Sequence, residues 1–252
     1  MNAVDRLIQT AENEVGYLEK KSNASLDSKT ANAGSANYTK YWRDMKPEWQ
    51  GEPWCDAFVS WCFLKTFGAD MAQKLLCGGL YSYYTPASAN CFKAHKQWHT
   101  TPRRGDVVYF QVGSNIGHTG IVEDFRNGYV ITIEGNTNGA SGVIQNGGGV
   151  CRKTYKYGSS YISGYGRPNY AIVEADDMTE ADWKKVKEYI DDKLEAVLKG
   201  YNTEPSNWAK KILPEAIEKG ITDGTRPKGY LTREEGAAMA LKASKVPEGD
   251  GK

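Results

Sequence analysis

The sequence predicts an α+β domain followed by a small all-α tail. Short β-like runs, such as residues 106–110 and 129–133, alternate with segments rich in Gly, Tyr and Trp up to about residue 172. Beyond that point the apolar residues recur at the spacing of one helix face: Trp183, Val186, Ile190, Leu194, Val197 and Leu198. A chain of 252 residues can build one large core and a smaller module. We therefore expect an α+β domain over residues 1–172, a helical connector over 173–205 and a helical module over 206–252.

The composition is that of an ordinary globular protein and argues against several classes. Apolar residues make up 40% and charged residues 25%, which does not fit a disordered or collagen-like chain. No run approaches the roughly 18 apolar residues that a membrane helix needs. The 32 Lys and Arg residues against 31 Asp and Glu leave no basic excess for binding phosphates. We expect neither nucleic acid nor a membrane as a partner.

The N-terminus and the cysteines predict a protein made in the cytoplasm. Charged residues interrupt the first 18 positions, so they contain no hydrophobic segment typical of a secretory signal. Five cysteines without a CxxC pair argue against a disulfide framework, because an odd number leaves at least one free thiol.

Cys55 differs from the other cysteines by its place at the start of a predicted helix. Residues 56–64 carry apolar side chains at helical spacing, and Gly68 is placed to end the helix. The unpaired amides and the positive dipole end at such a start stabilise a thiolate, which is the attacking form of cysteine. The alternative is an ordinary buried cysteine.

His118 is the candidate base, since the sequence contains three histidines and this one lies where a loop enters a probable strand. That strand leads through a hairpin tip at residues 126–128 into a second strand that ends at Glu134 and Asn136. A three-residue tip would place His118 opposite Asn136, with Glu134 on its diagonal. A two-residue Asn-Gly tip shifts the pairing by one residue and breaks this alignment. We predict the longer tip because it brings the three polar side chains together.

These residues together suit acyl transfer. The Cys55 sulfur would attack, and His118 would take a proton and later return it to a leaving amine. Glu134 or Asn136 would orient the imidazole, and the backbone N–H of Cys55 would donate to the oxyanion. In the alternative interpretation, a neighbouring carbonyl satisfies His118 and Glu134 is simply exposed at a strand end.

Several ordered motifs resemble a CHAP domain, the family of cysteine, histidine-dependent amidohydrolases and peptidases related to papain and NlpC. The resemblance covers about residues 3–170 and is carried by residues 37–41, 54–62, 104–110, 117–122, 134–136 and a closing strand at 162–168. It implies helices packed on an antiparallel β-sheet. It also implies cleavage of an amide bond in bacterial peptidoglycan through a thioester, by an amidase or an endopeptidase. Cys55 would be the nucleophile and His118 the base, with Glu134 and Asn136 as orienting groups.

We expect no cofactor. Some relatives bind calcium through aspartates ahead of the nucleophile, but residues 44–52 lack that cluster. Cys91, His95 and His99 are spaced four apart and would form a possible zinc face on a helix, although no fourth ligand is evident. We favour a structural helix here, and keep a zinc amidase as an alternative.

Aromatic residues around the predicted nucleophile can line a groove for glycan or peptide, because their rings offer apolar faces and polar tips. The candidates are Tyr38, Tyr41, Trp42, Trp49, Trp54, Tyr81, Tyr83 and Tyr84. Many of them must belong to the core. We predict Tyr38, Trp42 and Trp54 as substrate-binding residues, and Phe58 and Trp61 as core residues.

Residues 208–243 resemble one S-layer-homology-like repeat, which implies binding to a secondary cell-wall polymer. A structural or dimerising tail is the alternative, and the connector helix could also pair with another chain. The cytoplasmic expectation and the wall-directed motifs together predict a phage endolysin that reaches the wall through a holin pore. An exported autolysin of the same chemistry and a non-catalytic wall-binding protein are the alternatives.

Overall fold

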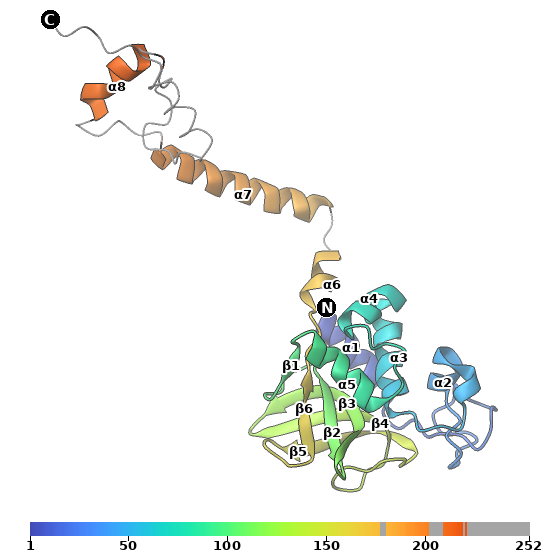
Figure 1. Ribbon diagram of the computed structural model, residues 1–252. Helices are drawn as coiled ribbons and strands as arrows, with labels where there is room; N and C mark the ends of the chain where they lie inside the picture. Colours follow the sequence, from blue (N-terminus) through green and yellow to red (C-terminus); the bar gives the residue numbers. More distant parts are fainter. Residues whose placement is uncertain (177–179, 202–208, 219, 221–252) are drawn as a thin grey trace, which may run out of the picture. The chain divides into compact units, whose positions relative to one another are not determined.

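The computed structural model describes residues 1–176, 180–201, 209–218 and 220. The chain divides into two compact units, Met1–Asp177 and Met178–Lys252. In the first unit, helices gather at one side of an antiparallel β-sheet (Figure 1). The predicted α+β fold with an antiparallel sheet is confirmed.

The first unit contains six α-helices, a short 3-10 helix and six strands within its described residues. The helices are α1 (Ala3–Glu12), α2 (Lys40–Met45), the 3-10 helix Pro47–Trp49, α3 (Cys55–Phe67), α4 (Ala69–Leu75), α5 (Thr85–Ala94) and α6 (Ala171–Asp176). The strands are β1 (Trp98–His99), β2 (Val107–Val112), β3 (Asn115–Arg126), β4 (Tyr129–Thr137), β5 (Gly149–Lys156) and β6 (Ile162–Gly166). They form one sheet in the order β1-β6-β2-β3-β4-β5.

The sheet separates two apolar clusters, as expected when side chains alternate along a strand. On β2, Val107 and Tyr109 belong to the large core shared with the helices, whereas Val108 and Phe110 belong to a smaller cluster. Tyr155 of β5 packs in this second cluster. Both faces of the central strands are therefore covered.

Helix α3 is the central helix of the first unit. Its side chains from Cys55 to Phe63 are all buried, so this part of the helix is enclosed on every side rather than buried along one face. It packs on β3 and β4. Gly135 permits this contact, because a Cβ there would lie 2.5 Å from the Cβ of Phe58. Gly68 ends the helix with φ of 75°, as the sequence predicts.

The β3–β4 hairpin corrects the predicted register. The tip is a two-residue turn, in which Asn127 and Gly128 have φ of 53° and 76° and Arg126 pairs with Tyr129. Asn-Gly suits this turn because both positions need positive φ. The prediction of a three-residue tip is therefore wrong.

A β-bulge at Glu123 then restores the alignment that the longer tip was expected to give. Asp124 pairs with Ile131 but Val122 pairs with Thr132, so one residue of β3 is left without an opposite partner. Beyond the bulge, His118 and Glu134 lie on one face of the sheet, within hydrogen-bonding distance.

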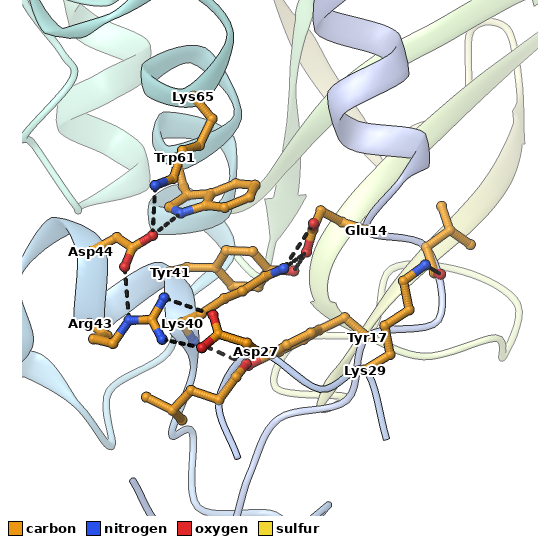
Figure 2. Close-up of polar contacts among 12 residues, drawn as sticks. Glu14, Tyr17, Asp27, Lys29, Lys40, Tyr41, Arg43, Asp44, Trp61 and Lys65 are labelled. Atoms are coloured by element: carbon orange, nitrogen blue, oxygen red, sulfur yellow. Dashed lines mark hydrogen bonds and ion pairs between the residues drawn. The ribbon is translucent and has the colours of Figure 1, made fainter. Parts of the chain in front are cut away.

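The segment between α1 and α2 is fastened to α2 by buried and exposed polar contacts (Figure 2). The Glu14 carboxylate accepts from the Tyr41 hydroxyl at 2.7 Å and from Lys40 at 2.9 Å. Arg43 makes a two-pronged ion pair with Asp27 at 2.8 and 2.9 Å. These contacts hold the N-terminal segment against α2.

Asp44 extends this network from α2 to α3 (Figure 2). Its carboxylate accepts from the Trp61 indole at 2.9 Å and pairs with Lys65 at 3.0 Å. Both partners lie on α3, so α2 is tied to the helix that begins at Cys55.

The second unit contains α7 (Glu180–Tyr201) and α8 (Ala209–Glu218) among its described residues. Helix α7 falls where the apolar repeat predicts a connector helix. Of its described apolar side chains, Val186, Tyr189, Ile190 and Leu194 are exposed. The rest of the S-layer-homology-like segment, from residue 221 onward, lies outside the described residues. None of the described helices is both long and apolar enough to cross a bilayer.

Candidate active site

Cys55 is the first residue of α3, as the sequence predicts. Trp54 precedes it and supplies no side-chain cap, so its side chain leaves the first-turn amides of α3 free for a ligand. The Trp54 indole is fully buried and donates to Glu19 at 2.9 Å. Its ring also stacks on Tyr41. These two contacts fix Trp54, and with it the start of α3.

His118 lies on β3 with 1% of its surface exposed. Its Nε2 is 3.0 Å from Oε2 of Glu134, which is fully buried on β4. The imidazole also packs at a tilt against Phe110, with ring centres 5.6 Å apart. A carboxylate, and not a neighbouring carbonyl, therefore orients the ring. This leaves Nδ1 as the atom available to Cys55.

The electrostatics join Cys55, His118 and Glu134 into one group. Burial of the imidazole disfavours its charged form, but hydrogen bonds and charge interactions with Cys55 and Glu134 outweigh this and raise the pKa of His118 to about 9. The ring is then protonated at neutral pH.

Two residues that the sequence analysis did not identify hold Glu134 in place. The Thr132 hydroxyl donates to Oε1 at 2.5 Å, and the Tyr155 hydroxyl donates to Oε2 at 3.3 Å. Thr132 lies two positions before Glu134 on the same strand, so strand alternation contains a signal for it. Tyr155 comes from β5, and its approach depends on a register that the sequence does not reveal.

Gly120 makes room for this carboxylate. A Cβ at this position would lie 2.6 Å from Cγ of Glu134. The glycine is therefore required by the close approach of the two strands at this point.

Asn136 is not a hydrogen-bond partner of His118 in the structure. The residue has φ of 56° and lies where the pairing of β4 with β5 shifts between Glu134 and Thr137. Its side-chain oxygen is buried and has no partner among the described residues. Of the two orienting candidates, the structure places Glu134 on the imidazole.

A cleft of about 640 Å³ opens beside Cys55. It is lined by Glu48, Trp49, Glu52, Pro53, Cys55, Asp56, Tyr83, Tyr84, Thr85, Pro86, Ile116, Gly117 and Gln145. The lining comes from the segment before α3, the start of α3, the start of α5, β3 and the β4–β5 loop. The sequence analysis did not single out Asp56 or Gln145.

The aromatic residues of this cleft differ from the predicted ones. Trp42 and Trp54 are buried to 1% and 0% exposure, so they belong to the core and do not line the cleft. The indole N–H of Trp42 is satisfied inside the fold by the carbonyl of Glu52 at 2.9 Å. Tyr38 is half-buried and also lies outside the lining. The cleft uses Trp49, Tyr83 and Tyr84 instead.

The zinc alternative is not supported by the geometry. Helix α5 ends at Ala94, His95 follows its end, and His99 lies on β1. Lys96 takes a left-handed conformation between them, so Cys91, His95 and His99 do not share a helix face. Within the described part of the chain, no group of three or more His, Cys, Asp or Glu residues is arranged to hold a metal ion.

Comparison with known proteins identifies part of the chain. The CHAP domain family matches residues 47–136. No curated protein sequence matches the chain. The crystal structure of Ly7917 is similar with 16% identity and a TM-score of 0.39, over 68% of this chain and 63% of that one.

A second structure, Ly7917 with the hydrolyzing product of MDP, is similar with 18% identity and a TM-score of 0.37, over 66% of this chain and 62% of that one. The present chain thus spans less than two thirds of the length of either solved chain. The family match contains Cys55, His118, Glu134 and Asn136. Residues 47–136 thus match the CHAP domain family.

Proposed function

We propose that this protein hydrolyses an amide bond of bacterial peptidoglycan with Cys55 as the nucleophile. The observation that carries the proposal is the buried group formed by Cys55, His118 and Glu134 at the edge of an open cleft. The CHAP domain match over residues 47–136 supports peptidoglycan as the substrate.

In the first half of the reaction, the Cys55 thiolate attacks the carbonyl carbon of the scissile amide. The oxyanion of the tetrahedral intermediate accepts a hydrogen bond from the backbone N–H of Cys55 at the start of α3. When the intermediate collapses, the C–N bond breaks and His118 gives its proton to the leaving amine. A thioester on Cys55 and a neutral imidazole remain.

In the second half, His118 accepts a proton from water, and the resulting hydroxide attacks the thioester carbonyl. The C–S bond then breaks, a carboxylic acid is released and the thiolate–imidazolium pair is restored. Glu134 lies within hydrogen-bonding distance of Nε2, so it stabilises the imidazolium whenever His118 is protonated.

The scheme holds for the muramoyl-L-alanine bond and for a peptide bond of the stem or cross-bridge, so both remain within the proposal. The endolysin role, the exported alternative and polymer binding by residues 206–252 stay predictions from the sequence.

The proposal is tested with purified cell walls and the variants Cys55→Ala and Cys91→Ser. Loss of turbidity and the appearance of new amino and carboxyl ends, identified by mass spectrometry, measure hydrolysis. Cys55→Ala should abolish both signals, because the nucleophile is removed. Cys91→Ser should retain them, which also tests the zinc alternative. Undiminished hydrolysis by Cys55→Ala would overturn the proposal.

A further inference from the structure

The cleft beside Cys55 is acidic. Its lining contains Glu48, Glu52 and Asp56, and no Lys, Arg or His. The two glutamates are exposed, whereas Asp56 directly follows the nucleophile and is 4% exposed. The charged side chains that line this cleft are therefore all acidic.

Among the described residues, these carboxylates have no ion-pair partner; the Lys46 ammonium lies instead over the rings of Trp49 and Tyr83. Neither Glu48 nor Glu52 forms an ion pair there. Asp56 accepts hydrogen bonds at 3.1 Å and 2.9 Å from the hydroxyls of Ser82 and Ser88, which are neutral donors. Burial raises the pKa of Asp56 to about 6 against the opposing effect of these hydroxyls, so the group is ionised at neutral pH.

The aromatic residues of the cleft also suit a cation. Trp49, Tyr83 and Tyr84 present ring faces, which attract ammonium groups. An ammonium of the chain itself shows this affinity, since Nζ of Lys46 lies 4.2 Å from the centre of the Trp49 ring. Burial and the charges of Tyr81, Glu48 and Asp56 raise the pKa of Tyr83 to about 12. The negative charges of Glu48 and Asp56 therefore both act on the Tyr83 side chain.

We propose that the cleft selects a peptide segment that carries a primary ammonium group close to the scissile amide, such as the free side-chain amine of a diamino acid in a wall peptide. Charge determines this preference, because the unpaired carboxylates of the cleft attract an ammonium group and repel a carboxylate of the substrate. The inference rests on the proposed function for the identity of the peptide, but binding tests it separately from hydrolysis.

The test uses Cys55→Ala protein, which binds without turnover, and calorimetry with two synthetic stem peptides. The peptides differ in one group: the lysine side-chain amine is free in one and N-acetylated in the other. Exposed charge pairs are individually weak, so we expect the free-amine peptide to bind about five- to tenfold more tightly through the combined carboxylates. High salt should reduce the preference, since the two glutamates are exposed.

Matched variants assign the preference to the cleft. Adding Glu48→Gln and Glu52→Gln should lower the affinity ratio and leave only the contribution of Asp56, whereas Asp70→Asn, which removes an exposed acid outside the cleft, should leave the ratio unchanged. Equal affinities, absence of binding by either peptide, or a preference that the double glutamine variant does not reduce would overturn the inference. Amine-selective binding without hydrolysis by the unmodified protein would instead contradict the proposed function and leave this inference standing.

Discussion

Replacement of Glu134 by Gln gives the sharpest test of how His118 is tuned. Both partners of the 3.0 Å contact are buried, with side-chain exposures of 1% and 0%, so solvent does not screen it. A hydrogen bond to a charged group contributes about 1.5–3 kcal/mol. At about 1.36 kcal/mol per pH unit, its loss should lower the pKa of His118 by about one to two units from its value of about 9.

The direction of the activity change follows from the protonation state. The active pair is thiolate and imidazolium, so activity falls on the basic side when His118 loses its proton. At pH 9 the protonated fraction of His118 should fall from about one half to a few per cent, and kcat/KM should fall about 5- to 50-fold. At more acidic pH His118 is protonated in both proteins, so their kcat/KM values should differ less.

The assay is the pH profile of kcat/KM, together with an NMR titration of the histidine rings. The exposed His95 serves as an internal reference, because it lies outside the site. Thr132→Val removes one donor to Glu134 and should produce a smaller shift in the same direction. An unchanged basic limb and an unchanged His118 titration in Glu134→Gln would refute the assigned role of Glu134.

Three further predictions follow from the packing. Gly120→Ala should displace Glu134, lowering activity at least about tenfold and the free energy of unfolding by about 1–3 kcal/mol, as urea titration and circular dichroism would report. The pKa of Asp56 is raised from 3.8 to about 6 in the folded protein, so its ionisation lowers the free energy of unfolding as pH rises through this window. Asp56→Asn removes this ionisation and should be more stable than the unmodified protein between pH 5 and pH 8. The gain should reach up to about 3 kcal/mol, as measured by urea unfolding. Trp42→Phe should lower the melting temperature with KM unchanged, whereas Trp49→Ala should raise KM, and the reverse pattern would restore Trp42 to substrate binding.

Features set by local sequence were predictable. The start of α3 at Cys55 and its end at Gly68 follow from an apolar periodic run and a glycine, which act within one helix. These features need no knowledge of distant residues.

Features set by tertiary contacts were not predictable. The two-residue tip at Asn127 is a local preference, but the bulge at Glu123 that compensates for it is tied to Arg152 on β5 at 2.5 Å. Similarly, the indoles of Trp42 and Trp54 are buried against acceptors 10 and 35 positions away, beyond the reach of local pattern. The sequence contains many aromatic residues near Cys55, and nothing local distinguishes the buried rings from those in the cleft.

The most direct measurement of the central claim is the rate at which iodoacetamide alkylates each cysteine, followed by peptide mass spectrometry at mildly acidic pH. Cys55 is 9% exposed, whereas Cys91 and Cys151 are half-buried, so burial alone predicts that Cys55 reacts more slowly than they do. We expect the opposite order, with Cys55 reacting first because the charged His118 ring activates its sulfur, and with this advantage lost in His118→Ala. A Cys55 that reacts no faster than Cys91 and Cys151, or that keeps its rate without His118, would contradict the account.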